Sequence, residues 1–280
     1  EIEFSDWSSD VCSSDLTCWS KAKFKRIVYL FIDALRFDSA FSKENKPWTN
    51  HMPNLMSMGN SSNTHRYHFM AHYPTATNQR IKGLFCGVIP PFIEIGETVA
   101  QAEVACDSLV KQTKKQNKTN VAIGDGIWAS SYGPYLDRSY LTGSNNIADR
   151  LGSDGVCEQY YTTELQEGVN DFVVFHTLGL DHAGHFYMSL QSDEYIKELE
   201  WNDQFAKKVL DILPKDSLYI VAGDHGMTLD GNHGGGTPDE LDAAMLLYSP
   251  FGLGRDYHGT DTVMQIDITS TMSLAIGVPV

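Results

Sequence analysis

The chain has 280 residues, 42% of them apolar, which is enough to bury one sizeable core, and α/β chains of this length commonly form a single domain. Thirty-six acidic against 21 basic side chains give a formal charge of -15, which repels nucleic acid and disfavours it as a partner. The longest uninterrupted apolar run, Ile27–Ile32, is far shorter than the roughly 20 residues that span a bilayer.

The two ends of the sequence are unlike those of a complete protein. Residues 1–16 carry no initiator Met and no signal-peptide pattern, and their Ser/Asp-rich text reads like a translated sequencing adapter. We therefore interpret 1–16 as a non-native or adapter-derived segment and 17–280 as one domain. The chain stops at Val280 without a polar tail, so we expect a fragment of a longer protein whose transmembrane regions are missing.

Short apolar runs and periodic segments predict the fold. Buried strands, each followed by a polar, Gly-bearing turn, are expected at Arg26–Ile32, Asn120–Ile123, Phe172–Leu178 and Leu218–Ala222. Helices are expected over Val99–Lys111 and over Asp193–Leu213, the latter with a Ser192 cap and a stop at Pro214. The alternation predicts an α/β fold, with a doubly wound, mostly parallel sheet flanked by helices.

Cysteines and glycosylation motifs bear on the compartment. Five cysteines without a C-x-x-C pair indicate neither a zinc knuckle nor a dense disulfide framework, and leave the redox compartment open. Two Asn-x-Ser/Thr triplets, at Asn60 and Asn117, favour a secretory lumen, although such triplets also arise by chance.

Four aspartates sit just past predicted strand ends: Asp33, Asp125, Asp181 and Asp224. In a doubly wound sheet, ligands gather at the carboxyl ends of the strands. Carboxylates that meet on one edge repel one another in a low-dielectric crevice unless cations neutralise them. The sequence therefore predicts a metal site at this edge.

Histidines near these aspartates indicate which metal. Asp181 and His185 lie four residues apart in what we interpret as a tight turn that Gly184 allows. One such turn alone is more often a hydrogen-bonded loop, but a second Asp-His pair and a histidine in a glycine-rich loop occur with it. Mixed carboxylate and imidazole ligands suit zinc. Two sets of three ligands, each with an open position, can be formed from Asp33, Asp181, His185, Asp224, His225 and His233.

A paired zinc site of this kind can clamp the attacking and leaving oxygens of a displacement at phosphorus, and it needs a nucleophile. The best candidate is Thr77, in a turn that leads into an apolar segment, and Thr75 is its competitor. A threonine at a helix start is ordinarily a cap. The two roles can coexist, because a helix N-terminus also favours a phosphate dianion.

Four motifs occur along the chain in a fixed order: Phe31–Asp38, Pro74–Leu84, Leu178–His185 and Ala222–Gly235. Together they resemble the glycosylphosphatidylinositol (GPI) ethanolamine phosphate transferases, most closely the type that modifies the third mannose. The similarity extends from about Cys18 to the end of the chain. Gly124–Trp128, with one acid where the family has two, and Phe186–Met188, without the usual Gly-Pro, depart from the pattern.

The resemblance implies an alkaline-phosphatase-like fold with two zinc ions and Thr77 as the nucleophile beside them. It assigns one ion to Asp33, Asp224 and His225 and the other to Asp181, His185 and His233. It makes 17–280 the lumenal catalytic domain of an endoplasmic reticulum membrane enzyme. That enzyme would move phosphoethanolamine from phosphatidylethanolamine to a mannose hydroxyl of the GPI precursor through a phosphothreonine, with a small membrane subunit as a further partner.

Other interpretations stay open. A soluble phosphodiesterase or phosphatase of the same superfamily would use water in place of mannose, and a non-catalytic domain would bind zinc without turnover. A sulfatase is disfavoured because no Cys or Ser stands in a CxPxR-type context. We interpret His176 and His182 as hydrogen-bonded structural residues and Asp125 as a turn acid. Asp203 would either brace a metal ligand or sit at a partly solvated helix edge.

Overall fold

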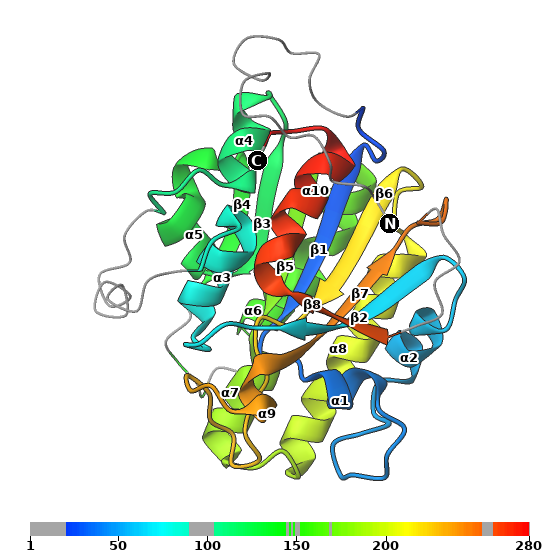
Figure 1. The fold of residues 1–280 in the computed structure, drawn as a ribbon, viewed down its shortest axis with the longest axis vertical. Helices are drawn as coiled ribbons and strands as arrows, with labels where there is room; N and C mark the ends of the chain where they lie inside the picture. The colour runs from blue at the N-terminus through cyan, green and yellow to red at the C-terminus, as the bar shows by residue number, and fades with distance from the viewer. Residues whose placement is uncertain are drawn as a thin grey trace.

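The computed structural model describes residues 21–89, 104–143, 146, 148, 152–167, 170–253 and 260–279, so the segment 1–16 lies outside the described residues. The described chain contains one eight-stranded sheet with the order β4-β3-β5-β1-β6-β7-β2-β8 (Figure 1). Its strands are β1 (Arg26–Ile32), β2 (Thr64–Met70), β3 (Asn120–Asp125), β4 (Arg138–Thr142), β5 (Phe172–Thr177), β6 (Ser217–Ala222), β7 (Asp242–Tyr248) and β8 (Thr260–Met264).

The sheet is mostly parallel. Its central strand β1 pairs in parallel with β5 and β6, with Ile27 opposite Phe172 on one side and Leu218 on the other. Of the described strands, β7 alone runs against the rest, because it is antiparallel to both β6 and β2. The predicted doubly wound, mostly parallel α/β fold is confirmed, with one antiparallel strand that was not predicted.

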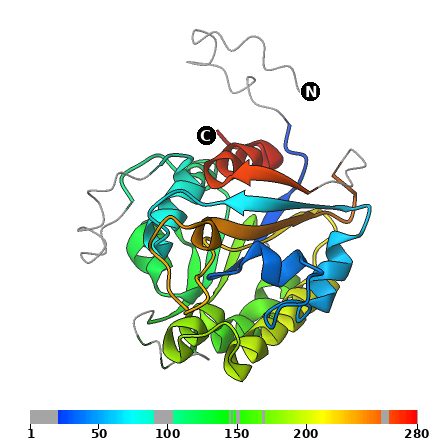
Figure 2. The ribbon, with the colours of Figure 1, turned by 60° about the horizontal axis from the view of Figure 1, so that its bottom comes forward.

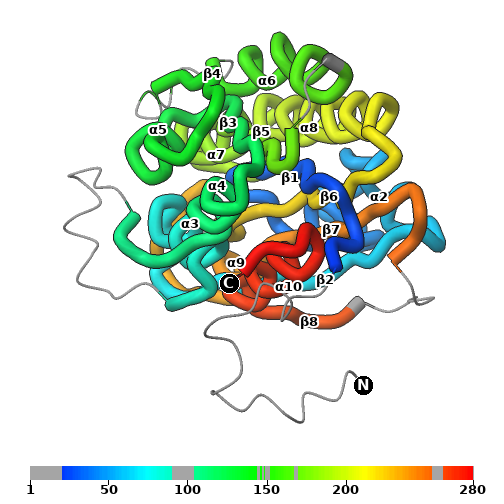
Figure 3. The backbone as a smooth tube through the Cα atoms, turned by 90° about the horizontal axis from the view of Figure 1, so that it is seen from above, coloured from blue at the N-terminus to red at the C-terminus, as the bar shows by residue number. Residues whose placement is uncertain are grey.

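Helices cover both faces of the sheet, as Figures 2 and 3 show. One face packs against α1 (Phe37–Phe41), α2 (Pro53–Gly59), α6 (Gly152–Thr162), α7 (Gly179–Tyr187) and α8 (Asp193–Asp211). The other packs against α3 (Thr77–Cys86), α4 (Leu109–Lys115), α5 (Ile127–Tyr132) and α10 (Ile268–Ile276). Short helical turns complete the chain at η3 (Gly133–Tyr135), η4 (Thr163–Glu167), α9 (Pro238–Leu241) and η5 (Gln265–Asp267).

The residues of β1 divide between the two cores. Val28 and Leu30 lie in the core beneath α8, whereas Tyr29 and Phe31 lie in the core beneath α3. Successive side chains of a strand point to opposite faces, so a strand covered on both sides needs apolar residues at every position. That requirement explains why the run was visible in the sequence and why β1 begins and ends where it was predicted.

Of the two predicted helices, one begins where it was predicted and the other begins later. Helix α8 begins at Asp193 as predicted, because the Ser192 side chain accepts a hydrogen bond from the Tyr195 amide. The helix predicted over Val99–Lys111 is wrong over 104–108, which is not helical, and is confirmed over 109–111. Helix α4 begins after Ser108, whose side chain caps it, and the remaining residues of that prediction lie outside the described ranges.

Two further features differ from the sequence interpretation. Asp203 of α8 is fully buried and lies at neither a metal ligand nor a solvated edge. Its carboxylate accepts hydrogen bonds from the Asn54 and Leu55 amides, at 3.1 and 2.8 Å, and so holds the first turn of α2. A disulfide joins Cys86, at the end of α3, to Cys106, a pairing that the sequence did not indicate.

Across the ranges that the structure describes, no helix has both the length and the apolar character that a membrane crossing requires.

Candidate functional site

The ends of β1 and β6 bring two aspartates together at the carboxyl edge of the sheet. Asp33 follows β1, and Asp224 follows β6, the strand beside it. The Ala34 amide donates to Asp224 Oδ1 at 3.1 Å, which ties the two strand ends to each other. Gly223 permits this approach, because a Cβ there would lie 2.5 Å from the Leu35 carbonyl oxygen. The predicted meeting of strand-end carboxylates is thus observed here.

The first ligand group consists of Asp33, Asp224 and His225, all within 1% of complete burial. One donor atom from each lies within 4.8 Å of the other two. His225 Nε2 is 3.4 Å from Asp33 Oδ1 and 3.2 Å from Asp224 Oδ2. These are the three residues that the family resemblance placed in one set.

The second group lies beside the first and shares a histidine with it. Donor atoms of Asp181, His225 and His233 lie within 4.8 Å of one another. Asp181 Oδ1 is 3.2 Å from His233 Nε2 and 3.4 Å from His185 Nε2, so His185 also borders this group. His182, from the same helix as Asp181, is buried.

The Asp181–His185 pair lies in a helix, α7, and the predicted tight turn is wrong. Residues four apart on a helix share a face, so the spacing brings both side chains together without a turn. Gly184 has another role: a Cβ there would lie 2.2 Å from Met227 Sδ. Helix α7 therefore packs directly on the 227–236 loop, and a Cβ on Gly231 of that loop would lie 2.0 Å from the Gly184 carbonyl oxygen.

Backbone carbonyls orient two of the imidazoles. His225 Nδ1 lies 2.8 Å from the Gly226 carbonyl oxygen, and His233 Nδ1 lies 2.7 Å from that of Thr75. A carbonyl only accepts, so each Nδ1 carries a proton and donates it. In the neutral rings, Nε2 then presents a lone pair to the carboxylates, the arrangement in which imidazoles bind metal ions.

The electrostatics of the cluster call for a cation. In the part of the chain that the structure describes, Asp33 Oδ1 and Asp224 Oδ2 are buried without a hydrogen-bond partner. Burial and the neighbouring carboxylates raise the pKa of Asp33, and burial raises the pKa of Asp224 to about 6. Burial lowers the pKa of His233, but Asp181 outweighs it and raises the value to about 9. A proton on His233 supplies positive charge where a metal ion would, so the residues fit a cation.

Thr77 lies beside the first group, next to the histidine that the two groups share. It is the first residue of α3, and Ala76 occupies the cap position without a side-chain hydrogen bond, so Thr77 does not cap the helix. Its Oγ1 donates to Asp33 Oδ2 at 3.3 Å and is 3.4 Å from His225 Nε2. The hydroxyl therefore faces the ligand groups at the start of a helix.

The hydroxyl of Thr75, the other candidate nucleophile, is hydrogen-bonded to the glycine-rich loop, 227–236. It is fully buried, donates to the Gly235 carbonyl oxygen at 2.7 Å and accepts from the Gly234 amide at 2.9 Å. Together with the Thr75 carbonyl, which accepts from His233, these bonds fix the loop. Of the two threonines, Thr77 is the one directed at the carboxylates.

His176, for which the sequence gave a structural role only, lies beside the first group. Its Nε2 is 3.3 Å from Asp33 Oδ2, and Trp128 Nε1 donates to its Nδ1 at 3.1 Å. Burial lowers the pKa of His176, so the ring is neutral near pH 7. Asp125 accepts from the Ile127 amide at 3.0 Å, as a turn acid does. The place of His176 next to a strand end was the sequence signal that could have revealed it.

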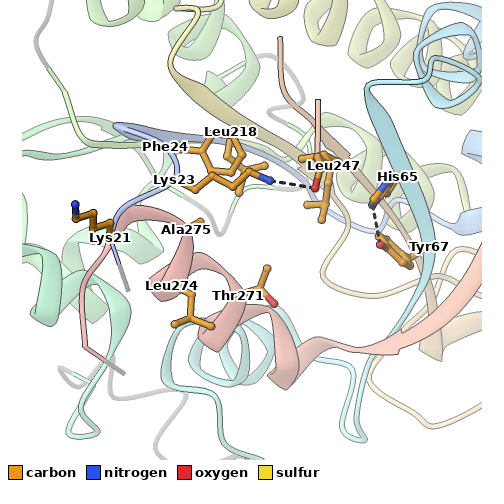
Figure 4. Close-up of a pocket in the computed structure, with 11 residues that line it drawn as sticks. Lys21, Lys23, Phe24, His65, Tyr67, Leu218, Leu247, Thr271, Leu274 and Ala275 are labelled. Carbon is orange, nitrogen blue, oxygen red and sulfur yellow. Dashed lines mark hydrogen bonds between the residues drawn. The ribbon is translucent and has the colours of Figure 1, made fainter. Parts of the chain in front are cut away.

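A cavity of about 470 Å³ lies away from these residues, near the amino ends of β1 and β6 (Figure 4). Its walls come from the segment before β1, from strands β2, β6 and β7 and from α10, and include Phe24, Tyr67, Leu218, Leu247 and Leu274. None of the ligand groups or Thr77 lines it.

Comparisons with known proteins agree with the fold. The structure resembles a protein of the alkaline phosphatase superfamily from Vibrio parahaemolyticus, with a TM-score of 0.62 and 15% identity, covering 92% of this chain and 67% of that one. It also resembles the periplasmic domain of EptC from Escherichia coli, in a complex with Zn. That match has a TM-score of 0.65 and 11% identity, covering 91% of this chain and 83% of that one.

Sequence comparisons define the family. The profile of type I phosphodiesterase / nucleotide pyrophosphatase matches residues 93–233, half of the chain. The human GPI ethanolamine phosphate transferase 3, catalytic subunit, is 32% identical over 282 residues, which cover 94% of this chain. The aligned part is 25% of that relative, so the chain spans about a quarter of its length.

Fold and site together define an α/β protein with an alkaline-phosphatase-like fold, whose carboxyl edge carries groups of carboxylates and imidazoles that could hold a metal ion. The chain belongs to the type I phosphodiesterase / nucleotide pyrophosphatase family. Within it, the predicted resemblance to the GPI ethanolamine phosphate transferases is confirmed.

Proposed function

We propose that the chain is the catalytic part of a phosphoethanolamine transferase, which moves phosphoethanolamine from phosphatidylethanolamine to a mannose hydroxyl of the GPI precursor. The position of Thr77 carries the proposal. Its hydroxyl lies within 3.4 Å of Asp33 and His225, and His225 belongs to both groups of residues that could hold a metal ion. A hydroxyl so placed can act as a nucleophile towards phosphorus. The name of the human relative supports the group transferred and the GPI acceptor.

We assign two zinc ions to the site. Asp33, Asp224 and His225 would hold one, and Asp181, His185 and His233 the other, with Thr77 beside both. The mixed carboxylate and imidazole donors favour zinc, and the zinc complex of the EptC domain supports it. When bound, the ions would supply positive charge that favours ionisation of a hydroxyl and offsets the charge of the phosphodiester.

The reaction has two displacements at the same phosphorus. First, Thr77 Oγ1 loses its proton as it attacks the lipid phosphodiester, the phosphorus–oxygen bond to diacylglycerol breaks, and the released oxygen takes up a proton. Phosphoethanolamine is then esterified to Thr77. Second, the mannose oxygen attacks as it loses its proton, and Thr77 Oγ1 leaves and regains one. Asp33 Oδ2, which accepts from Thr77 in the resting chain, holds the hydroxyl in place between turnovers.

We further propose that this domain faces the lumen of the endoplasmic reticulum and is held at the membrane by transmembrane regions outside the given sequence. The Cys86–Cys106 disulfide suits an oxidising compartment. Asn60 and Asn117, the candidate glycosylation sites, are both exposed. The human relative is named a catalytic subunit, which supports a separate partner subunit such as a small membrane protein.

A second candidate is a phosphodiesterase or phosphatase in which water resolves the ester on Thr77, and the family description favours it. An assay with phosphatidylethanolamine, with and without the GPI glycan, separates the two. Transfer predicts product on the glycan, whereas hydrolysis predicts free phosphoethanolamine with or without it. Thr77→Ala should abolish either activity while zinc content is unchanged, and retained activity would exclude the nucleophile. Bound zinc with no turnover would instead indicate a non-catalytic domain.

A further inference from the structure

Three buried side chains form a hydrogen-bonded line that ends on Asp33. They come from different elements: Trp128 from α5, His176 from β5, and Asp33 from the end of β1. Trp128 and His176 are fully buried and Asp33 is 1% exposed. The line thus crosses from one core to the candidate metal group without contact with solvent.

The tautomer of His176 follows from this line. An indole nitrogen only donates, so the 3.1 Å contact is a hydrogen bond from Trp128 Nε1–H to a lone pair on His176 Nδ1. In a neutral imidazole, the proton then resides on Nε2. That nitrogen lies 3.3 Å from Asp33 Oδ2 and donates to it.

The hydrogen bond from His176 gives the two oxygens of Asp33 different roles. Oδ2 accepts from His176 and from the Thr77 hydroxyl. Oδ1 has no hydrogen bond within the described ranges and lies 3.4 Å from His225 Nε2. A carboxylate held by one oxygen cannot rotate freely, so the other oxygen stays directed into the group that Asp33 forms with Asp224 and His225.

The alternative tautomer is disfavoured by its neighbours. Asp125 Oδ2 lies 3.5 Å from His176 Nδ1, but a proton on Nδ1 would oppose the Trp128 N–H. It would also leave a lone pair on Nε2 facing Asp33 Oδ2. Edge contact with Phe31, at 4.4 Å between ring centroids, further limits rotation of the imidazole.

We propose that His176 is a positioning residue that holds Asp33 for cation binding, and that Trp128 sets its tautomer. This inference rests on the proposed function, because it concerns one of the two metal groups assigned there. Outer partners of this kind orient metal ligands, and their loss commonly costs about 10- to 100-fold in metal affinity.

The test compares variants that keep different parts of the line. His176→Asn keeps an acceptor near Nδ1 and loses the donor to Asp33, whereas His176→Gln places an amide N–H near Nε2. Zinc affinity is measured by competition with a chromophoric chelator, and the melting temperature without zinc reports folding. We expect His176→Asn to weaken zinc binding by about 10- to 100-fold and His176→Gln to restore most of the loss.

A spectroscopic readout needs neither metal nor activity. In the zinc-free protein, the ¹⁵N shifts of His176 should show a protonated Nε2 and a bare Nδ1, and Trp128→Phe should change them. Wild-type zinc affinity in folded His176→Asn, or a proton on Nδ1, would overturn the positioning role alone. Absence of zinc binding by the wild-type chain would overturn it together with the metal assignment. Loss of transfer in Thr77→Ala tests the proposed function separately.

Discussion

The contact between α7 and the glycine-rich loop gives the sharpest prediction, for Gly231→Ala. Gly231 has a φ of +74°, and a Cβ there would lie 2.0 Å from the Gly184 carbonyl oxygen and 2.6 Å from its carbonyl carbon. The atoms it meets belong to the backbone of a buried helix, so no flexible side chain can move aside. One of the two elements must shift.

The loss of stability expected for Gly231→Ala has two parts. A left-handed conformation costs an alanine roughly 1–2 kcal/mol, and overpacking typically costs about 1–3 kcal/mol more. In a chain of this size, each kcal/mol lowers the melting temperature by roughly 2–4 °C, so we expect a decrease of about 4–20 °C. The shift would also separate Asp181 on α7 from His233 on the loop, which are 3.2 Å apart, and weaken zinc retention.

Differential scanning calorimetry with and without zinc checks this prediction against two controls. Gly234, in the same loop, has a φ of +106° but no heavy atom within 4 Å of an added Cβ, so Gly234→Ala reports the conformational part alone. Gly155→Ala, at the fourth residue of α6 with open space around it, should stabilise the chain by about 0.5–1 kcal/mol. Equal decreases in melting temperature for Gly231→Ala and Gly234→Ala would refute the steric argument.

Two other predictions concern charges away from the site. Asp203→Ala should lower stability by roughly 2–4 kcal/mol in urea unfolding, because the Asn54 and Leu55 amides lose their buried acceptor, while Asp203→Asn should lose less. Burial raises the pKa of Glu164, but the bond from Arg138 outweighs it, so the net shift is downward. The stability that this bond contributes is therefore present above about pH 4.5 and is lost as the pH falls through the lowered pKa. Arg138→Gln should cost about 1–2 kcal/mol at pH 7, a modest value because the arginine is partly exposed. The difference in stability from wild type should narrow below about pH 4.5 and close as the pH falls through the lowered pKa of Glu164; a difference independent of pH would contradict the assignment.

The sequence was sufficient for the central part of the fold because that part is buried on both sides. β1, β3, β5 and β6 consist of residues that are fully or nearly fully buried, so their apolar runs stand out. β2 and β4 have partly exposed residues and weak patterns, and were not predicted. The reversed direction of β7 depends on pairing with strands distant in sequence, which no local pattern encodes.

For the candidate site, residue types and positions after strands identified the clustered carboxylates and imidazoles. Their local geometry was less accessible. The spacing of Asp181 and His185 suits a turn or a helical face, and packing of Gly184 against Met227 accompanies the helix. The position of His176 at a strand end was visible in the sequence, but its direct contact with Asp33, 143 residues away along the chain, depends on the pairing of β5 with β1.

The central claim is that Thr77 carries the transferred group, and trapping that intermediate tests it most directly. The purified, zinc-loaded protein is incubated with phosphatidylethanolamine without glycan, quenched in acid and digested, and its peptides are sequenced by mass spectrometry. We predict a phosphoethanolamine ester on Thr77, removed when the glycan is added, absent in Thr77→Ala and retained in Thr75→Ser. A chain that turns over lipid without this ester, or that carries it on another residue, would contradict the account.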